Sequence, residues 1–191
     1  MTRHFKINES VTSVYFITCT ITQWLCIFKE EKYFAVIIDS LKYCMAHKGL
    51  ILAGYVIMPT HLHMMSSHSV DVRLPEIMRD FKHYTSTKIA ELLETDNNHL
   101  FLHVFRKATE GRTKKQNHKI WQDDYHPVAI TSEKWFREKI EYMHNNPVRK
   151  GFIESPEDWK YSSARNWIQG DDSIIKGDDS IIKIDRSLIW G

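Results

Sequence analysis

The sequence has few cysteines, glycines and prolines and no long apolar run, and each shortage excludes a class of protein. Its three cysteines, Cys19, Cys26 and Cys44, are odd in number and lack Cys-x-x-Cys spacing, which argues against a disulfide framework or a thiolate zinc site. Seven glycines and five prolines exclude a collagen-like or linker-dominated chain. The longest apolar run, Leu50 to Met58, is far shorter than the roughly 20 residues that cross a bilayer. The residues after Met1 carry no apolar signal-peptide core, so we expect a cytoplasmic protein with no membrane partner.

The chain is rich instead in aromatic side chains, and its charge is nearly balanced. Its 191 residues include 6 Trp, 8 Tyr and 9 Phe, which is ample material for a hydrophobic core and excludes intrinsic disorder. The net charge of +2 does not by itself indicate a nucleic-acid binder. The stretch from Arg106 to Lys119, however, contains six basic residues and a single acidic one, Glu110. This stretch either follows a phosphate backbone or forms a solvated loop.

Residue patterning predicts the order strand, helix, strand, strand, helix, strand and a further helix. The expected ranges are Ser13–Thr22, Glu30–His47, Leu50–Met58, His61–Ser66, Leu74–Leu93, two short strand pieces at Lys119–Gln122 and Val128–Ile130, and a last helix from Thr131 to about Asn145. A basic loop is expected after the second helix. This βαββαβ order predicts a ferredoxin-like α+β sandwich, with an antiparallel sheet covered by helices on one face. The open face of such a sheet is a usual place for nucleic acid.

We predict a main domain over residues 1–167 and a C-terminal appendage over residues 168–191. The appendage contains a tandem heptapeptide, GDDSIIK, at Gly170–Lys176 and again at Gly177–Lys183. Two copies are too few for a solenoid, so we interpret them as a local duplication without chemistry.

His61 and His63 flank Leu62 in a predicted strand. Side chains alternate between the two faces of a strand, so both imidazoles project to the same side while Leu62 points into the core. Two neutral imidazoles on one face can chelate a divalent cation and leave coordination positions open for substrate oxygens. Such a pair also arises by chance in a chain with eleven histidines.

The last predicted helix carries a second candidate group. Phe136, Ile140 and Met143 define its buried stripe, and Tyr142 lies roughly 120–160° around the helix from the centre of that stripe. Asn146 follows one turn later on the side of Tyr142, where an amide oxygen could complete a metal site beside a phenol. Alternatively, Tyr142 is a half-exposed surface tyrosine and Asn146 an ordinary residue at a helix end.

Four segments in this order resemble the single-tyrosine HUH transposases, and most closely their REP-associated branch. The segments are YVIMPTHLHMM at Tyr55–Met65, IWQDDYHPVAI at Ile120–Ile130, YMHNNPVRKGF at Tyr142–Phe152 and DWKYSSARNW at Asp158–Trp167. The resemblance extends over about Ser13 to Trp167. It implies that His61 and His63 bind Mg²⁺ or Mn²⁺, with Asn146 as third ligand and Tyr142 as nucleophile. The family also carries a Trp-Gln pair that matches Trp121 and Gln122.

The function that this resemblance implies is metal-dependent nicking and strand transfer of single-stranded or hairpin DNA through a 5′-phosphotyrosine intermediate. A phenol is a poor nucleophile at neutral pH unless a cation or base favours the phenolate, which a bound divalent ion would help to do. Candidate DNA contacts are Lys82, Trp121, Gln122 and Arg149, although a solvated surface charge or a core tryptophan would explain the same residues. Some members of the family exchange the tyrosine helix between subunits, so both a monomer and a homodimer are open.

Two other functions are compatible with these residues. One is a domesticated, non-catalytic nucleic-acid-binding module on the same fold. The other is a metal-dependent nuclease in which water, and not Tyr142, attacks the phosphate. Retention of both histidines, Tyr142 and Asn146 favours the transposase over the binding module, because a binder needs no metal pair.

Overall fold

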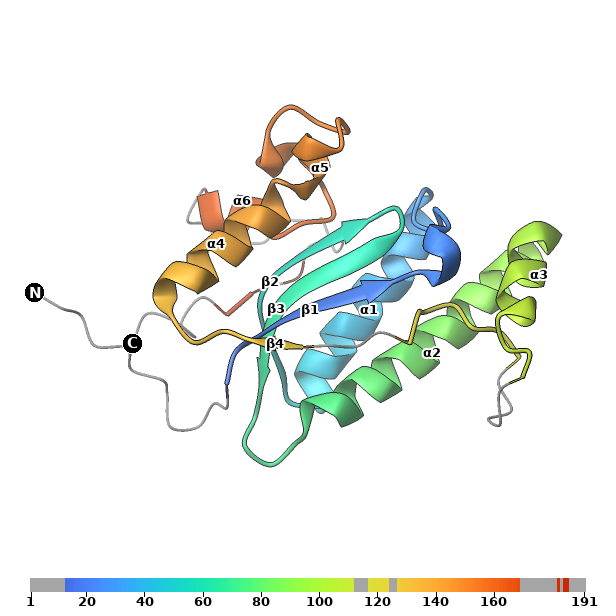
Figure 1. Ribbon diagram of the computed structural model, residues 1–191, viewed down its shortest axis with the longest axis horizontal. Coiled ribbons are helices and arrows are strands. Elements are labelled where there is room, and N and C mark those ends of the chain that lie inside the picture. Colours follow the sequence, from blue (N-terminus) through green and yellow to red (C-terminus); the bar gives the residue numbers. More distant parts are fainter. Residues whose placement is uncertain (1–12, 112–116, 124–126, 169–181, 183, 186–191) are drawn as a thin grey trace, which may run out of the picture.

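The computed structural model describes residues 13–111, 117–123, 127–168, 182, 184 and 185. Its elements are β1 (Tyr15–Thr20), η1 (Thr22–Trp24), α1 (Glu31–His47), β2 (Leu50–Met58), β3 (His61–His68), α2 (Leu74–Thr95), α3 (His99–Lys107), β4 (Val128–Ala129), α4 (Glu133–His144), α5 (Asn146–Arg149), η2 (Pro156–Asp158) and α6 (Ala164–Ile168). The strands form an antiparallel sheet in the order β2-β3-β1-β4 (Figure 1). The predicted α+β fold is therefore confirmed.

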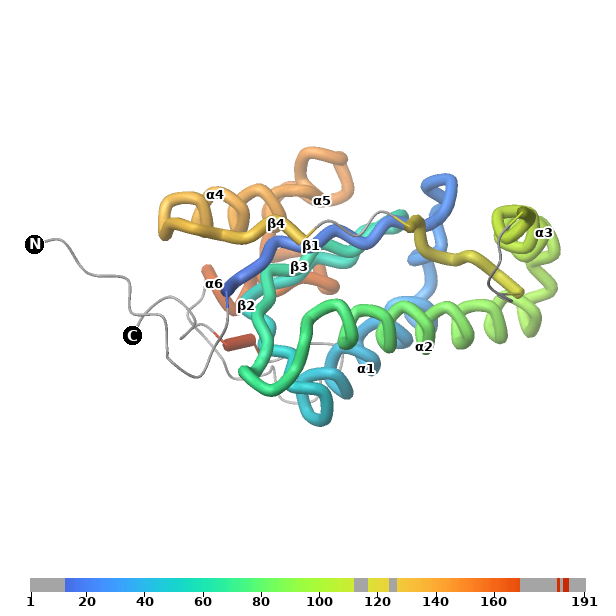
Figure 2. The backbone as a smooth tube through the Cα atoms, turned by 60° about the horizontal axis from the view of Figure 1, so that its bottom comes forward, coloured from blue at the N-terminus to red at the C-terminus, as the bar shows by residue number. Residues whose placement is uncertain are grey.

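The sheet lies between two layers of helices. Figure 2 shows α1 and α2 on one side of it and α4 and α5 on the other. The face toward α1 and α2 holds the larger core, which includes Ile17, Leu62 and Met64. The opposite face was expected to be open, but part of it is covered by α4, whose apolar stripe packs against the sheet. This correction follows from amphipathicity, because a helix with a buried stripe needs an apolar surface to cover.

Gly54 in β2 allows α4 to approach the sheet closely. A Cβ atom at this position would lie 2.8 Å from Ile140 Cδ1 and 2.9 Å from Met143 Cε. The pairing of β2 with β3 is also irregular here, between Leu52 and Gly54. At the start of α4, the Ser132 side chain accepts a hydrogen bond from the backbone N–H of Trp135 over 3.2 Å, as an N-cap does. These local features set the position of the helix that carries Tyr142.

The segment after α2 differs from the sequence-based expectation. It forms a helix, α3, where a basic loop was predicted, and its Leu102 and Phe105 side chains are buried. Asn98 caps this helix by accepting a hydrogen bond from Phe101 N over 3.2 Å. Arg106 and Lys107 of the basic stretch lie in the last turn of α3, whereas Arg112, Lys114 and Lys115 fall outside the described residues. None of the described helices has the length and hydropathy of a membrane-spanning segment.

Part of the C-terminal segment packs on the main domain. Ile182 and Ile184 are buried in the larger core, and the backbone N–H of Asp185 donates to Leu52 O over 2.8 Å. The boundary predicted after Trp167 therefore does not separate the whole C-terminal segment from the core. The first heptapeptide copy lies outside the described residues, and Ile182 is the one described residue of the second.

Candidate active site

The two histidines of β3 lie on the α4 side of the sheet, as the alternation of the strand predicts. Their ring centroids are 4.6 Å apart, and the exposed fractions are 7% for His61 and 6% for His63. His61 is the first residue of the strand, directly after the turn that joins it to β2. Leu62 between them is fully buried in the larger core on the opposite face. The pair therefore forms the floor of a site at one end of the sheet.

A threonine hydroxyl holds each imidazole in place. Thr60 Oγ1 lies 2.9 Å from His61 Nδ1, and Thr18 Oγ1 lies 2.8 Å from His63 Nδ1. Among the described residues, neither Nε2 atom takes part in a hydrogen bond. Metal-binding histidines commonly use one ring nitrogen for such an anchoring bond and the other for the ion. The two Nε2 atoms thus remain the nitrogens that could bind a ligand.

Burial keeps both imidazoles neutral at physiological pH. It is the largest cause that lowers the pKa of His61 to about 4, with a further contribution from the charge of Lys150. The pKa of His63 is lowered to about 3, first by burial and then by the charges of His61, Lys139 and Arg149. Desolvation disfavours the charged imidazolium, and positive neighbours disfavour it further. Neutral imidazole is the form that coordinates metal ions.

Tyr142 lies over this pair in the same chain. Its ring centroid is 5.8 Å from that of His63 and 6.3 Å from that of Phe16, and the Phe16 ring in turn stacks on His63 at 5.2 Å. The side chain is 43% exposed, which confirms that Tyr142 is not an ordinary core aromatic. The structure therefore brings a solvent-accessible phenol to the predicted histidine pair without a second subunit.

Two cations surround the Tyr142 ring. The guanidinium carbon of Arg149 lies 4.4 Å from the ring centroid, and its Nη2 donates a hydrogen bond to the Tyr142 carbonyl. Lys139 Nζ lies 5.5 Å from the same centroid and 5.1 Å from that of Phe16. Positive charge fixed here stabilises negative charge that develops on a nearby oxygen, whether of a phenolate or of a phosphate.

Asn146, the predicted third metal ligand, opens α5 directly after the break at the end of α4. Its exposed fraction is 6%, and its side-chain amide makes no hydrogen bond with any described residue. Within the described ranges, no three His, Cys, Asp or Glu side chains form a group that could hold a metal ion. Metal binding would therefore need further oxygen ligands beside the two imidazoles, and the role of Asn146 stays a prediction.

Two of the four predicted DNA contacts are engaged within the fold, on the side of the sheet that α1 and α2 cover. Trp121 is 4% exposed, and its Nε1 donates to Thr85 Oγ1 over 2.9 Å. Of the two environments left open for Trp121, the structure shows the core, where its ring packs against Phe28 and Phe81. Lys82 Nζ donates to the Gln122 carbonyl over 3.2 Å.

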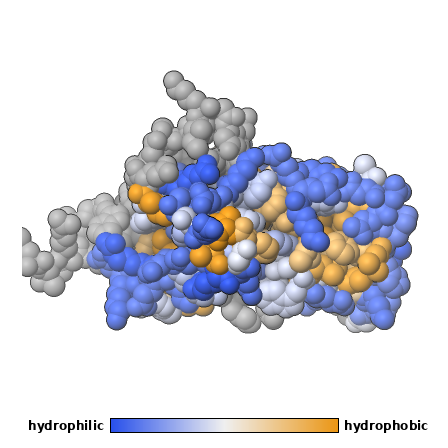
Figure 3. Space-filling model, turned by 90° about the horizontal axis from the view of Figure 1, so that it is seen from above, coloured by the Kyte–Doolittle hydropathy of each residue, from blue (hydrophilic) through white to orange (hydrophobic). Residues whose placement is uncertain are grey.

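The other two predicted contacts have different surroundings. The Gln122 amide donates to Ile21 O over 3.2 Å, which supports the turn after β1, whereas Arg149 remains exposed beside Tyr142. Figure 3 looks onto the side of α4 and α5, where hydrophilic residues predominate and hydrophobic ones are visible between them. Of the four, Arg149 is the residue that the structure places at the tyrosine.

His144 anchors the end of α4, and no sequence pattern assigned it a role. Its Nε2 lies 2.8 Å from Ser163 Oγ, which accepts a hydrogen bond from Tyr55 N over 2.9 Å. Burial lowers the pKa of His144 to about 4, so the imidazole is neutral. His144 lies in one matched segment and Ser163 in the next, but only the folded chain shows that they meet.

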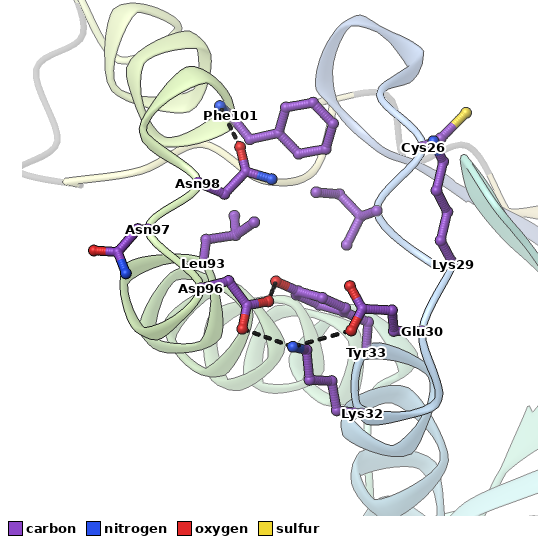
Figure 4. Close-up of a pocket in the computed structure, with 11 residues that line it drawn as sticks. Cys26, Lys29, Glu30, Lys32, Tyr33, Leu93, Asp96, Asn97, Asn98 and Phe101 are labelled. Carbon is purple, nitrogen blue, oxygen red and sulfur yellow. Dashed lines mark hydrogen bonds and ion pairs between the residues drawn. The ribbon is translucent and has the colours of Figure 1, made fainter.

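The pocket drawn in Figure 4 lies apart from this site, between the start of α1 and the junction of α2 and α3. Four of the polar side chains that line it, Glu30, Lys32, Tyr33 and Asp96, are paired with one another. Lys32 Nζ is 2.6 Å from Asp96 Oδ1, and Tyr33 Oη donates to Asp96 Oδ2 over 2.6 Å. None of the predicted site residues lines this pocket. It therefore contributes nothing to the candidate chemistry.

The sequence is similar to those of curated proteins. A candidate REP-associated tyrosine transposase of Haemophilus influenzae is 27% identical over 115 residues, which are 60% of this chain and 59% of that protein. The REP-associated tyrosine transposase of Escherichia coli is 34% identical over 44 residues, 23% of this chain and 27% of that protein. The chain is a relative of the REP-associated tyrosine transposases. No family model matches it.

A solved structure shares the fold. The structure of a REP-associated tyrosine transposase bound to a REP hairpin superposes with a TM-score of 0.60 at 16% identity, covering 89% of this chain and 87% of that one. The matched sequence spans less than two thirds of the two REP-associated relatives. The structural likeness therefore supports the fold, while the activity of this chain is a matter of proposal.

Proposed function

We propose that this protein nicks single-stranded or hairpin DNA and transfers the cut strand, with Tyr142 as nucleophile and a divalent cation at His61 and His63. The observation that carries the proposal is the 5.8 Å separation of the Tyr142 and His63 rings within one chain. A binding module has no need for an exposed phenol next to two neutral imidazoles. Hairpin DNA is favoured as the substrate class because the structural neighbour is bound to a REP hairpin.

The donor atoms suit Mg²⁺ or Mn²⁺ when DNA completes the coordination. His61 and His63 would hold the ion through their free Nε2 atoms, and the unbonded amide oxygen of Asn146 could add an oxygen ligand. When bound, a divalent cation polarises the scissile phosphate and offsets charge in the transition state. The threonine bonds to both Nδ1 atoms fix the orientation of the imidazoles. When each Nδ1–H donates to its threonine, the lone pair of Nε2 points toward the ion.

The residues around Tyr142 supply the remaining requirements of the reaction. Tyr142 Oη attacks the phosphorus and loses its proton, and the bond to the 3′-oxygen of the preceding nucleotide breaks. That oxygen takes up a proton as a free 3′-hydroxyl, and the 5′-phosphate stays on the tyrosine. Arg149 and Lys139 stabilise the phenolate and the crowded phosphate oxygens. One phosphodiester is exchanged for another, so a second 3′-hydroxyl can reverse the step on a new strand.

A trapping experiment tests this proposal. The chain is incubated with Mn²⁺ and a set of single-stranded and hairpin oligonucleotides labelled at the 3′ end, and the products are separated under denaturing conditions. We expect a labelled protein adduct that Tyr142→Phe and EDTA both abolish. Tyr43→Phe is a matched control, because Tyr43 is 56% exposed on α1 and should leave the adduct unchanged.

The same experiment separates the alternatives. If the DNA is cleaved without forming an adduct, and Tyr142→Phe still cleaves it, the protein is a metal-dependent nuclease that uses water. DNA binding with neither cleavage nor metal dependence would identify a binding module. Because Tyr142 is exposed, Tyr142→Phe should change the free energy of unfolding by no more than about 0.5 kcal/mol. Loss of the adduct could then be attributed to the missing hydroxyl.

A further inference from the structure

Trp24 is an exposed aromatic residue next to the histidine pair that neither the sequence motifs nor the proposed reaction uses. Its exposed fraction is 59%, although a tryptophan usually buries most of its large apolar surface. Its ring lies nearly perpendicular to that of His61, with an interplanar angle of 73° and the ring centroids 5.9 Å apart. An apolar ring is thus displayed to solvent beside the place where we expect the DNA phosphate.

The backbone that presents Trp24 adopts an unusual conformation. Gln23 and Trp24 both have a φ of +55°, in a region that residues other than glycine seldom occupy. Residues held in this conformation persist only where the surroundings fix them, and they cluster at functional sites. A less strained turn could join β1 to α1, so the conformation calls for a reason beyond chain connection.

Hydrogen bonds within the turn and to two other segments fix its conformation. Ile21 N donates to Thr60 O over 2.9 Å, and Thr22 N donates to Ile120 O over 2.8 Å. Ile21 O accepts from Trp24 N over 2.9 Å and from the Gln122 amide over 3.2 Å. Figure 1 shows the loop after β1 beside the turn between β2 and β3. The indole is therefore held on a rigid support next to His61.

We propose that the Trp24 ring is a stacking platform for the base of a nucleotide that flanks the phosphodiester at His61 and His63. The proposal rests on the function proposed above. Because the Trp24 and His61 rings are neighbours, a phosphate bound at the imidazoles would place one of its two adjoining nucleosides beside the indole. Lys150, whose charge acts on His61, adds positive charge for the DNA backbone on this side. Aromatic rings accept any base, so the platform positions the strand and favours purines, which stack more strongly.

Binding measurements on a non-cleaving background test the platform. In a Tyr142→Phe chain, the affinity for a labelled hairpin with a single-stranded extension is measured by fluorescence anisotropy with Mg²⁺. Loss of one stacked base corresponds to about a tenfold weaker affinity. We therefore expect Trp24→Ala to bind about 10-fold more weakly and Trp24→Phe to stay within about 3-fold of the parent. Tyr43→Ala, an exposed aromatic on α1, should bind like the parent.

Abasic substitution locates the stacked nucleotide. Each base of the single-stranded extension is removed in turn, and the affinities of the parent and of Trp24→Ala are compared. At one position next to the nicked phosphate, base removal should weaken the parent about 10-fold and leave Trp24→Ala unchanged. If base removal weakens both proteins equally at every position, Trp24 merely covers His61 and the proposal is overturned.

Failure of the platform and failure of the proposed function are distinguishable. If the wild-type chain forms a Tyr142 adduct but Trp24 shows no coupling to any base, the proposed function stands and the stacking platform is overturned. A chain that shows the coupling but forms no adduct keeps the platform and lacks the transferase activity. Trp24→Phe guards against a folding artefact, because it keeps an aromatic ring on the same backbone.

Discussion

The two faces of the sheet differ in what their side chains do, although the same strands form both. Toward α1 and α2, Leu62 and Met64 of β3 are fully buried among apolar neighbours. Toward α4, the alternate positions of the same strand hold His61, His63 and Met65. One face stabilises the fold, and the other combines a smaller core with the candidate site. Because successive side chains of a strand point to opposite faces, β3 can contribute to the core on one face and to the candidate site on the other.

The faces also differ in how their polar groups are satisfied. On the face toward α1 and α2, the Trp121 N–H donates a hydrogen bond to the Thr85 hydroxyl, and both residues are buried. On the other face, two buried imidazoles keep Nε2 atoms without a partner in the described chain. These ring nitrogens are therefore the atoms of the pair that could bind a ligand. The first face thus holds the larger core, and the second holds the groups that could bind a ligand.

The largest effect that would sharpen this comparison is expected from His61→Ala. Loss of one imidazole should reduce nicking at least about 10³-fold, because it removes a ligand of the cation that activates the phosphate. Affinity for single-stranded DNA should change by only a few-fold, because backbone electrostatics dominate binding. Adduct formation and anisotropy on the same preparation measure the two quantities.

Leu62→Ala, one residue further along β3, is the matched change on the opposite face. It should lower the free energy of unfolding by about 2–5 kcal/mol while the folded fraction still nicks DNA. Equal losses of affinity and of nicking in His61→Ala would mean that the histidines hold the DNA or the fold and not a cation.

A smaller effect concerns acid sensitivity, which we expect to originate on the α4 side. The pKa values of His61, His63 and His144 are lowered to about 4, 3 and 4. As the pH falls from about 6.5 toward 4, the unfolded chain binds protons at these imidazoles while the folded chain does not. The free energy of unfolding should therefore decrease through this window, with a slope approaching about 1.4 kcal/mol per pH unit for each imidazole.

Urea unfolding in EDTA at several pH values between 7.5 and 4.5 measures this slope. His144→Asn should reduce it, since one of the buried imidazoles is gone. His83→Asn, on the exposed side of α2, should keep the full slope. A His144→Asn chain with an unchanged slope would contradict the assignment.

The smallest effect separates two cations that were predicted as DNA contacts from the sequence. Arg149→Gln should weaken binding of single-stranded DNA about 3-fold and reduce the salt dependence by about 0.7 in log–log slope, the share of one phosphate contact. Lys82→Gln should leave that slope unchanged, because Lys82 Nζ is engaged with the Gln122 carbonyl on the other face. Titrations at several salt concentrations give the slopes, and equal changes in both variants would remove the distinction between the faces.

Much of the fold was predictable because the relevant patterns are local. The apolar run Leu50–Met58 coincides with β2, and the last helix begins within two residues of the predicted Thr131. His61 and His63 share a face because alternation is a property of any strand. The exposure of Tyr142 likewise follows from its angle to the buried stripe of α4. The candidate nucleophile and histidines could thus be selected before any contact between distant segments was known.

The remaining features depend on contacts between distant segments, which patterning along the chain does not encode. Trp121 had two possible environments, and only its packing against Phe28 and Phe81 placed it in the core. The α3 helix was missed because its nine residues form a weak local signal that burial of Leu102 and Phe105 stabilises. By itself, the sequence determined the elements, their faces and the chemistry they could carry. Only the tertiary structure decided that Trp24 lies beside His61, that His144 meets Ser163 and that Tyr142 faces His63, because these contacts join residues from 19 to 79 positions apart and form only when the layers pack together.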